Sequence, residues 1–208
     1  MRPDLLRSIT FDEKGLIPVI VQHYFTGQVL MLAFSNAEAV ELTIRTGEIH
    51  FFSRSRQKLW HKGRTSGNIM ELVELRIDCD QDCLLALVRP LGPACHTGEK
   101  TCFYRSITGD STADISFLDE LYQILLSRKE LLPENSYTAN LFQQGIKRIS
   151  QKIGEEGVET SLAMTSGDRN EVIAESADLI YHLMVGLVER GIALEELVQE
   201  LLSRHTNP

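Results

Sequence analysis

The sequence of 208 residues lacks the features that would place it among membrane, secreted or disordered proteins. No apolar run reaches the roughly 18 residues that a membrane span requires. Residues 1–15 contain Asp4, Arg7, Asp12 and Glu13 in place of the apolar stretch of a signal peptide, so we expect a cytoplasmic protein with no membrane partner. Low-complexity tracts and internal repeats are missing, and a hydrophobic content of 43% excludes a disordered chain.

An excess of positive charge is missing as well. The chain has 21 Lys and Arg against 29 Asp and Glu, which gives a net charge of −8. Residues 1–110 hold 13 basic and 13 acidic side chains, so residues 111–208 hold the remaining 8 and 16. A general nucleic-acid binder carries a basic surface, and this balance therefore predicts no nucleic-acid partner.

Cysteine is scarce but concentrated in one segment. Its four residues all lie between positions 79 and 102, namely Cys79, Cys83, Cys95 and Cys102. Disulfides are disfavoured in a reducing compartment, so metal binding is the leading interpretation of this cluster.

Hydrophobic alternation in the first half of the chain predicts short strands and one helix. The helical spacing covers residues 36–46. The expected strands cover residues 18–23, 28–34, 49–53, 70–77 and 83–88. This half should therefore form a mostly β domain of the α+β class.

The second half has a purely helical pattern. Residues 106–114 are small and polar with no hydrophobic period, so we place a linker there, between a first domain of residues 1–114 and a second of residues 115–208. Helices are expected over residues 116–129, 137–164, 168–189 and 194–203. Four such helices predict an all-α bundle, small enough that a homodimer would help to bury its apolar stripes.

Two of these helices begin with a capping signal. Ser116 opens a Ser-x-x-Asp cap, and Asp168 with Glu171 forms a capping box. The apolar side of the first helix should contain four leucines, Leu118, Leu121, Leu125 and Leu126.

Two carboxylate pairs mark the helical half. Glu156 and Glu159 are three residues apart on one expected helix, and Glu175 and Asp178 are three apart on the next. This spacing places each pair on one helical face, so facing helices could direct four carboxylates at one Mg²⁺ ion. A solvated acidic face is the alternative, but Glu175 and Asp178 have small and apolar neighbours.

Basic residues and glycines surround the first pair. Lys147, Arg148 and Lys152 precede it on the same helix and could meet a phosphate chain, or they could be ordinary surface charges. Gly154 and Gly157 weaken a helix, and a close approach of backbone or ligand is one reason to retain them.

Asp78, Asp80 and Asp82 alternate with other residues in the first half. On an extended segment the three carboxylates would share one face and Cys79 the other, which would place a hard oxygen site behind a soft sulfur site. A solvated turn is the alternative. The cysteines could form a four-sulfur structural zinc site, or a three-cysteine catalytic site with water in the fourth position.

Two further features could serve the cysteine site. His96 directly follows Cys95 and could act as a general acid or base beside a metal. Residues 53–68 contain five Lys or Arg, several hydroxyls, two glycines and no acid, which suits a phosphate-binding loop. A basic RNA-binding patch, with Trp60 for stacking, is the competing interpretation.

These segments together resemble the bifunctional phosphoribosyl-AMP cyclohydrolase/phosphoribosyl-ATP pyrophosphatase family of histidine biosynthesis. The resemblance covers nearly the whole chain in the family's domain order. It depends on Phe52-Ser-Arg-Ser-Arg56, Leu59-Trp-His-Lys-Gly63, Thr65-Ser-Gly-Asn68, Asp78-Cys-Asp-Gln-Asp82, Ala94-Cys-His-Thr-Gly98, Cys102-Phe103, Lys152-Ile-Gly-Glu-Glu-Gly-Val-Glu159 and Glu175-Ser-Ala-Asp-Leu-Ile-Tyr-His182.

The resemblance implies a barrel-like sheet with a capping helix, followed by a helical bundle of the nucleotide pyrophosphohydrolase type. It implies a catalytic zinc bound by Cys79, Cys95 and Cys102 drawn from two subunits of a homodimer, which leaves Cys83 unliganded. It also implies Mg²⁺ on Asp78, Asp80 and Asp82, and Mg²⁺ on Glu156, Glu159, Glu175 and Asp178. Two residues depart from the family pattern: Arg64 stands where an acidic residue is expected, and Ser35 where methionine is usual.

We therefore expect two consecutive hydrolyses of small phosphoribosyl nucleotides. The helical domain would use Glu156 and Glu159 to release pyrophosphate, with Lys147 and Lys152 contacting the substrate. The first domain would then open the adenine ring between N1 and C6, with His96 moving protons and Arg54, Arg56 and Lys62 binding phosphate. The alternatives are a house-cleaning nucleotide pyrophosphatase and a structural-zinc module that binds RNA.

Overall fold

The computed structural model describes residues 6–109 and 114–206. It divides into two compact units, Met1–Ala113 and Asp114–Pro208, which are described separately. This division lies next to the boundary expected at residue 114. Part of the expected linker, residues 110–113, lies outside the described residues.

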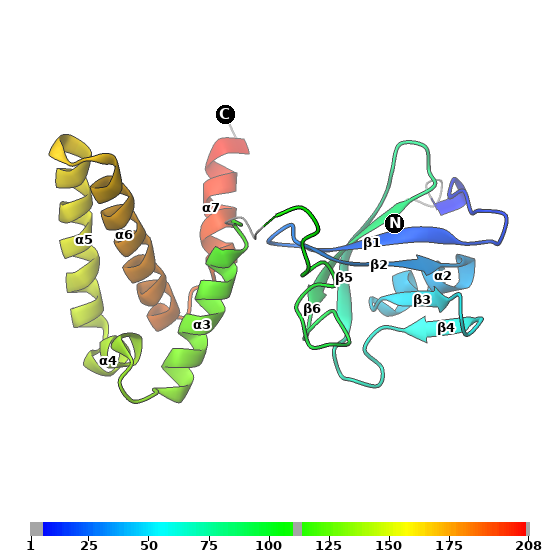
Figure 1. Ribbon diagram of the computed structural model, residues 1–208, viewed down its shortest axis with the longest axis horizontal. Helices are drawn as coiled ribbons and strands as arrows, with labels where there is room; N and C mark the ends of the chain where they lie inside the picture. Colours follow the sequence, from blue (N-terminus) through cyan, green and yellow to red (C-terminus); the bar gives the residue numbers. More distant parts are fainter. Residues whose placement is uncertain (1–5, 110–113, 207–208) are drawn as a thin grey trace. The chain divides into compact units, whose positions relative to one another are not determined.

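A four-stranded sheet forms the centre of the first unit (Figure 1). Its strand order is β2-β1-β6-β5, with β1 antiparallel to β2, β5 antiparallel to β6, and β1 parallel to β6. The strands are β1 Ile17–His23, β2 Val29–Ser35, β5 Met70–Ile77 and β6 Leu84–Pro90. Alternate residues of β1, beginning with Ile17 and Val19, are buried, as the sequence pattern predicts for a strand with one face on a core.

A hairpin and a helix complete this unit. The strands β3 His50–Ser53 and β4 Lys58–His61 pair antiparallel, and α2 Ala37–Thr46 precedes them. The expected mostly β unit with one helix is confirmed, although β4 was not predicted because its segment was interpreted as part of a phosphate-binding loop. Phe51, Ile49 and Met70 are fully buried in the core between the sheet and these elements.

The second unit is entirely helical among its described residues, as expected. Its helices are α3 Phe117–Leu131, α4 Tyr137–Gln144, α5 Ile146–Ser166, α6 Arg169–Arg190 and α7 Leu194–Thr206. Figure 1 shows α5 and α6 side by side as a helical hairpin, with α4 at one end of α5. Leu125, Ile149 and Val185, from three different helices, are buried in the core of this unit.

The single helix expected over residues 137–164 is wrong, because Gly145 divides it into α4 and α5. Its backbone has φ 78° and ψ −177°, a conformation that essentially only glycine adopts. The Gly145 amide donates to the carbonyls of Leu141 and Phe142 and closes α4. Hydrophobic periodicity continues across the break, so the pattern alone did not reveal it.

The helix starts differ from one another. Asp168 caps α6 as predicted, accepting hydrogen bonds from the amides of Asn170 and Glu171. The predicted Ser116 side-chain cap is wrong. The residue has a helical backbone and no side-chain cap bond, and its amide donates instead to Asp114.

Most of the apolar side expected for α3 is present. Leu125 is buried, and Leu118 and Leu121 pack against the same core. Leu126 is 38% exposed, so its placement on the buried side is wrong. Across the described residues, no helix has the length and apolar character needed to span a bilayer.

Candidate active sites

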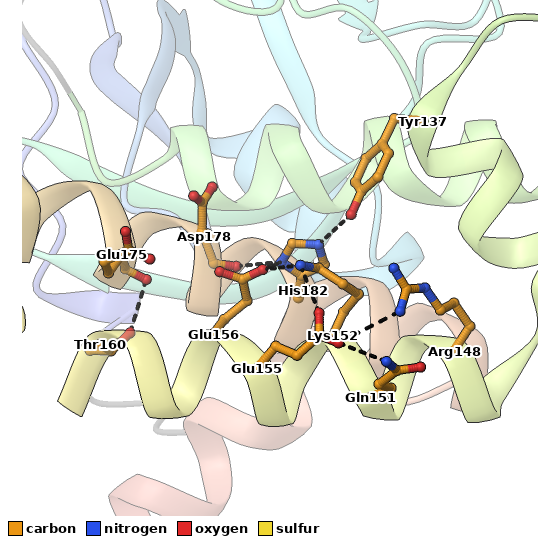
Figure 2. Close-up of polar contacts among 10 residues, drawn as sticks. All are labelled: Tyr137, Arg148, Gln151, Lys152, Glu155, Glu156, Thr160, Glu175, Asp178 and His182. Carbon is orange, nitrogen blue, oxygen red and sulfur yellow. Dashed lines mark hydrogen bonds and ion pairs between the residues drawn. The ribbon is translucent and has the colours of Figure 1, made fainter. Parts of the chain in front are cut away.

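The paired helices α5 and α6 bring carboxylates together. Glu156 extends from α5, and Glu175 and Asp178 extend from α6, so that one oxygen of each lies within 4.8 Å of the others. The Thr160 hydroxyl donates a 3.0 Å hydrogen bond to the Glu175 carbonyl and joins the two helices beside the cluster (Figure 2). Spacings of three residues on facing helices predicted this convergence.

Glu159 lies one turn farther along α5 and is exposed. Among the described residues it is not part of the group within 4.8 Å. Partial burial raises the pKa of Glu175, and the charges of Glu159, Glu156 and Asp178 raise it further. A cation placed among these carboxylates would relieve their repulsion.

Lys152 already supplies one positive charge to this cluster. Its Nζ atom lies 2.6 Å from Oε1 of Glu156 and 3.1 Å from Oε2 of Glu155. Glu156 is only 4% exposed, so its charge requires a close partner. Hydrogen bonds to Glu156 and Glu155 raise the pKa of Lys152, which therefore remains an ammonium ion.

Glu155 shares Lys152 with Glu156 and has two further partners of its own. Gln151 donates to it at 2.7 Å, and Arg148 lies 3.6 Å from its Oε1 (Figure 2). Arg148 is therefore occupied by a neighbouring side chain, as an ordinary helix-surface charge would be. Lys147 is exposed.

The two glycines of α5 leave space beside the cluster. A Cβ atom at Gly154 or at Gly157 would meet nothing within 4 Å. The close backbone approach considered for them is therefore wrong. The close contact between α5 and α6 occurs at Gly186, where a Cβ would lie 2.9 Å from Cδ1 of Ile153.

Two residues of this site were not predicted to have a function from the sequence. His182 is buried, with Nδ1 3.6 Å from Oε1 of Glu156 and Nε2 2.9 Å from the Tyr137 hydroxyl. Its position four residues after Asp178 was a usable signal, because that spacing returns to the same helical face. Tyr137 lies on α4, and no local spacing connects it to the cluster.

The aspartates of the first unit lie on a turn. Asp78, Asp80 and Asp82 are exposed, and their oxygens lie within 4.8 Å of one another. The expected extended segment is wrong because β5 ends at Ile77, and Gln81 has a φ of 69°. Oδ1 of Asp78 accepts hydrogen bonds from the amides of Asp82 and Cys83, which close the turn. The charges of Asp80 and then Asp78 raise the pKa of Asp82.

Two of the predicted zinc ligands interact within one chain. Cys95 is buried and Cys102 is exposed, and the two thiols are close enough for each to affect the pKa of the other. Hydrogen bonds, above all from the Thr97 hydroxyl 3.0 Å away, lower the pKa of Cys95 and favour its thiolate. Desolvation raises the pKa of Cys102.

The other two cysteines lie next to the aspartate turn. Cys79 is exposed, and no group of three metal-binding residues that includes it with Cys95 and Cys102 forms within the described part of one chain. Cys83 is half-buried, and its thiol lies 3.8 Å from the Leu84 carbonyl. Burial raises the pKa of Cys83, as it does that of Cys102. His96 is exposed, with Nδ1 3.9 Å from the Cys95 sulfur.

The predicted phosphate contacts fall into two environments. Arg54 and Arg56 are exposed on the β3–β4 turn, where the Arg54 guanidinium lies 3.9 Å above the Phe34 ring. Lys62 is 6% exposed and close enough to Cys102 and Cys95 for their charges to act on it. Burial lowers the pKa of Lys62, and the two cysteines oppose that change.

The two departures from the family pattern have simple environments. Ser35 is buried, and its hydroxyl donates to the His50 carbonyl, which connects β2 to β3. Arg64 is exposed in the turn after β4.

Two family models match the chain in succession. The model described as phosphoribosyl-AMP cyclohydrolase matches residues 31–104, and the model described as phosphoribosyl-ATP pyrophosphohydrolase matches residues 118–205. The first match contains the aspartate turn and the cysteines, and the second contains the α5–α6 carboxylates.

Proteins named histidine biosynthesis bifunctional protein HisIE are similar to almost the whole chain. The protein of Photobacterium profundum is 50% identical over 203 residues, which are 97% of this chain and 98% of that protein. The protein of Caldanaerobacter subterraneus subsp. tengcongensis is 49% identical over 200 residues, which cover 96% and 98%. The protein of Escherichia coli is 50% identical over 191 residues, which cover 92% of each chain.

Proposed function

The chain belongs to the bifunctional family that joins a phosphoribosyl-AMP cyclohydrolase to a phosphoribosyl-ATP pyrophosphohydrolase, and from this premise we propose which residues carry out each hydrolysis. The pyrophosphohydrolase unit cleaves phosphoribosyl-ATP into phosphoribosyl-AMP and pyrophosphate. The cyclohydrolase unit then adds water to the adenine ring of phosphoribosyl-AMP, and the N1–C6 bond opens. Both reactions belong to histidine biosynthesis. The second unit of the chain catalyses the earlier reaction, and the first unit catalyses the later one.

The carboxylate cluster suits Mg²⁺. This ion binds hard oxygen ligands at about 2.0–2.1 Å, so two ligands of one ion lie at most about 4.2 Å apart. Oxygens of Glu156, Glu175 and Asp178 lie within 4.8 Å of one another, so small side-chain movements would bring them to that spacing. We assign these three residues, with Glu159 beside them, to Mg²⁺. When bound, Mg²⁺ draws the substrate phosphates to the cluster and offsets their charge.

The neighbouring side chains have separate tasks in this proposal. Lys152 is paired with Glu156 and is available to a phosphate once a divalent cation takes over that carboxylate. Lys147, which is exposed nearer the start of α5, would contact phosphate farther from the cluster. Glu159 is the exposed carboxylate next to Glu175, where it can accept a proton from the attacking water. The observation that carries the assignment is the cluster of three carboxylates inside the region matched as a pyrophosphohydrolase.

For the cyclohydrolase unit, we propose zinc on Cys79, Cys95 and Cys102. Thiolates are ligands that zinc prefers, and the hydrogen bonds to Cys95 favour its thiolate. Zinc, when bound, makes water a stronger nucleophile at neutral pH. His96 is next to Cys95 and would move the protons as the ring opens, while the Lys62 ammonium offsets the charge of the thiolates.

A homodimer would complete the zinc site. Cys95 and Cys102 interact within one chain, and Cys79 lies on a separate turn, so we propose that Cys79 is supplied by a second copy. Mixing inactive Cys79→Ser and Cys95→Ser chains tests this arrangement. In a shared site, each mixed dimer regains one intact site, and ring opening returns to about a quarter of the unmodified activity. Failure of the mixed chains to recover would place all three ligands in one subunit.

The remaining assignments concern the phosphates and a second Mg²⁺. The exposed carboxylates of Asp78, Asp80 and Asp82 repel one another and offer the oxygen ligands that Mg²⁺ prefers. Arg54 and Arg56 are exposed on a neighbouring turn, and we assign them to the phosphates of phosphoribosyl-AMP. Lys62 is buried beside the thiols, which favours a role beside the zinc over a phosphate contact.

We place these reactions in the cytoplasm, since zinc-binding thiols require a reducing environment. The alternative of a structural-zinc module that binds RNA is disfavoured because residues 31–104 match the cyclohydrolase family. A house-cleaning pyrophosphatase is disfavoured for the same reason, since it leaves the first unit without an activity.

A further inference from the structure

His182 connects the carboxylate cluster to a residue of another helix. The imidazole is 4% exposed. Its Nδ1 atom lies 2.9 Å from the Asp178 backbone carbonyl and 3.6 Å from Oε1 of Glu156, and its Nε2 atom lies 2.9 Å from the Tyr137 hydroxyl (Figure 2). Both ring nitrogens of His182 therefore have a hydrogen-bond partner, and the ring lies beside the Glu156 carboxylate.

The chemistry of these partners fixes the proton of the neutral ring. A backbone carbonyl only accepts, so Nδ1 carries hydrogen and donates to Asp178. Nε2 then has a lone pair, and the Tyr137 hydroxyl donates to it. Burial raises the pKa of Tyr137, which keeps this donor protonated. The N–H side of the imidazole consequently faces Glu156 and the Asp178 backbone.

Tyr137 is held in place at the first turn of α4. The neighbouring Thr138 hydroxyl lies 2.7 Å from the Tyr181 hydroxyl on α6, so two adjacent side-chain pairs join α4 to α6. The Tyr137 ring also meets the His182 ring edge to face, with centroids 6.0 Å apart. Tyr137 is 53% exposed, so its hydroxyl can be removed without opening the core.

We propose that Tyr137 and His182 form a positioning pair for the pyrophosphohydrolase site, in which Tyr137 orients the imidazole and the imidazole fixes Glu156 relative to Asp178. Glu156 is bonded to Lys152 at 2.6 Å, and the N–H edge of His182, with Nδ1 3.6 Å from Oε1, borders the same carboxylate and limits its position. Partners beyond the ligands orient them in metal sites, and their loss typically weakens metal binding or activity. The inference rests on the proposed Mg²⁺ role of Glu156 and Asp178.

Four variants of the full chain test this inference. Tyr137→Phe removes only the hydroxyl that orients the ring. Tyr181→Phe removes the neighbouring hydroxyl of the same α4–α6 contact and is the matched control. His182→Leu removes both ring nitrogens, whereas His182→Asn retains an N–H donor near the position of Nδ1.

The first readout is Mn²⁺ binding to the metal-free protein. The electron paramagnetic resonance signal of free Mn²⁺ measures how much of the ion remains unbound. The chain has more than one proposed metal site. The part of the Mn²⁺ binding that Glu156→Gln loses is therefore taken as the binding to the carboxylates of the helical unit. The second readout is the Mg²⁺ concentration that gives half-maximal pyrophosphate release. Ring opening of supplied phosphoribosyl-AMP monitors the first unit of the same molecules, and the helical circular dichroism signal monitors the folding of the second.

We expect Tyr137→Phe to weaken Mn²⁺ binding at the helical site by about 3-fold to 10-fold, and His182→Leu by about 10-fold to 100-fold. His182→Asn should recover part of that loss, and Tyr181→Phe should bind Mn²⁺ like the unmodified protein. The Mg²⁺ requirement should follow the same order while ring opening stays unchanged.

Two results would overturn the positioning role. One is unchanged Mn²⁺ affinity in Tyr137→Phe. This result would count against the proposal even if His182→Leu fails to fold. The other is an equal loss in Tyr137→Phe and Tyr181→Phe, which would mean that α4 only needs to be docked. If the unmodified chain releases no pyrophosphate, the proposed function fails instead, so the two failures are distinguishable.

Discussion

The Lys152 ammonium nitrogen lies 2.6 Å from Oε1 of Glu156, which gives a buried carboxylate a cationic partner on the same helix. A divalent ion bound by Glu156 would compete for that oxygen. Lys152 would then be released from Glu156, and a substrate phosphate could take the place of that carboxylate.

Replacing Lys152 with Gln should therefore have two opposite effects. Mn²⁺ binding without substrate should tighten severalfold, because the competing ammonium is gone. Pyrophosphate release should slow by about 10-fold to 100-fold, because a charged contact to phosphate is lost. A Mn²⁺ titration and a pyrophosphate assay measure the two effects. Weaker Mn²⁺ binding in Lys152→Gln would show that the lysine holds the cluster together instead.

Adjacent glutamates provide a matched test of the carboxylate cluster. Glu156→Gln should reduce pyrophosphate release by about a hundredfold or more, because it removes an Mg²⁺ ligand. Glu155→Gln should have a small effect, since Glu155 is outside the carboxylate cluster and contacts Lys152, Arg148 and Gln151 instead. Both variants should open supplied phosphoribosyl-AMP at the normal rate. Equal losses in the two variants would contradict the assignment of Glu156.

The cysteines allow a similar comparison in the first unit. Cys95→Ser should lose bound zinc and ring opening while pyrophosphate release continues. Cys83→Ser should keep both activities, because zinc is assigned to Cys79, Cys95 and Cys102 and the half-buried Cys83 is left out of that set. Zinc content is measured by elemental analysis of the purified chains. Loss of zinc from Cys83→Ser would favour the alternative interpretation, in which all four cysteines bind a structural zinc.

Two glycines of the second unit should respond oppositely to alanine. Gly145→Ala should lower the free energy of unfolding by about 1–3 kcal/mol, because alanine does not tolerate the φ of 78° between α4 and α5. Gly154→Ala should raise it by about 0.5–1 kcal/mol, because Gly154 is helical and a Cβ there meets open space. Urea unfolding measures both. An increase in the free energy of unfolding of Gly145→Ala would mean that α4 and α5 can continue as one helix.

The sequence predicted the elements whose periodicity is local. Alternation in β1 identified the buried face of the strand, and Asp168 was recognised as the start of α6. The spacing of three residues placed Glu175 and Asp178 on one face of that helix, where both join the cluster. In each case the information lay within one or two turns of the chain.

Features that depend on backbone conformation or on distant partners were not predictable in this way. Gly145 breaks a segment whose apolar period continues through it, and the alternating aspartates resemble a strand although Gln81 turns the chain. Tyr137 and His182 are 45 positions apart and meet only because the fold brings the first turn of α4 to side chains of α6. No local pattern encodes such a contact.

One chain that performs two hydrolyses, each in its own unit, should process its first substrate through both steps. The most direct measurement supplies the purified protein, Zn²⁺ and Mg²⁺ with phosphoribosyl-ATP, and follows pyrophosphate, phosphoribosyl-AMP and the ring-opened product by chromatography. We expect pyrophosphate and phosphoribosyl-AMP to appear first and the ring-opened product afterwards. Pyrophosphate without any ring-opened product, from protein that contains zinc, would contradict the assignment of the first unit.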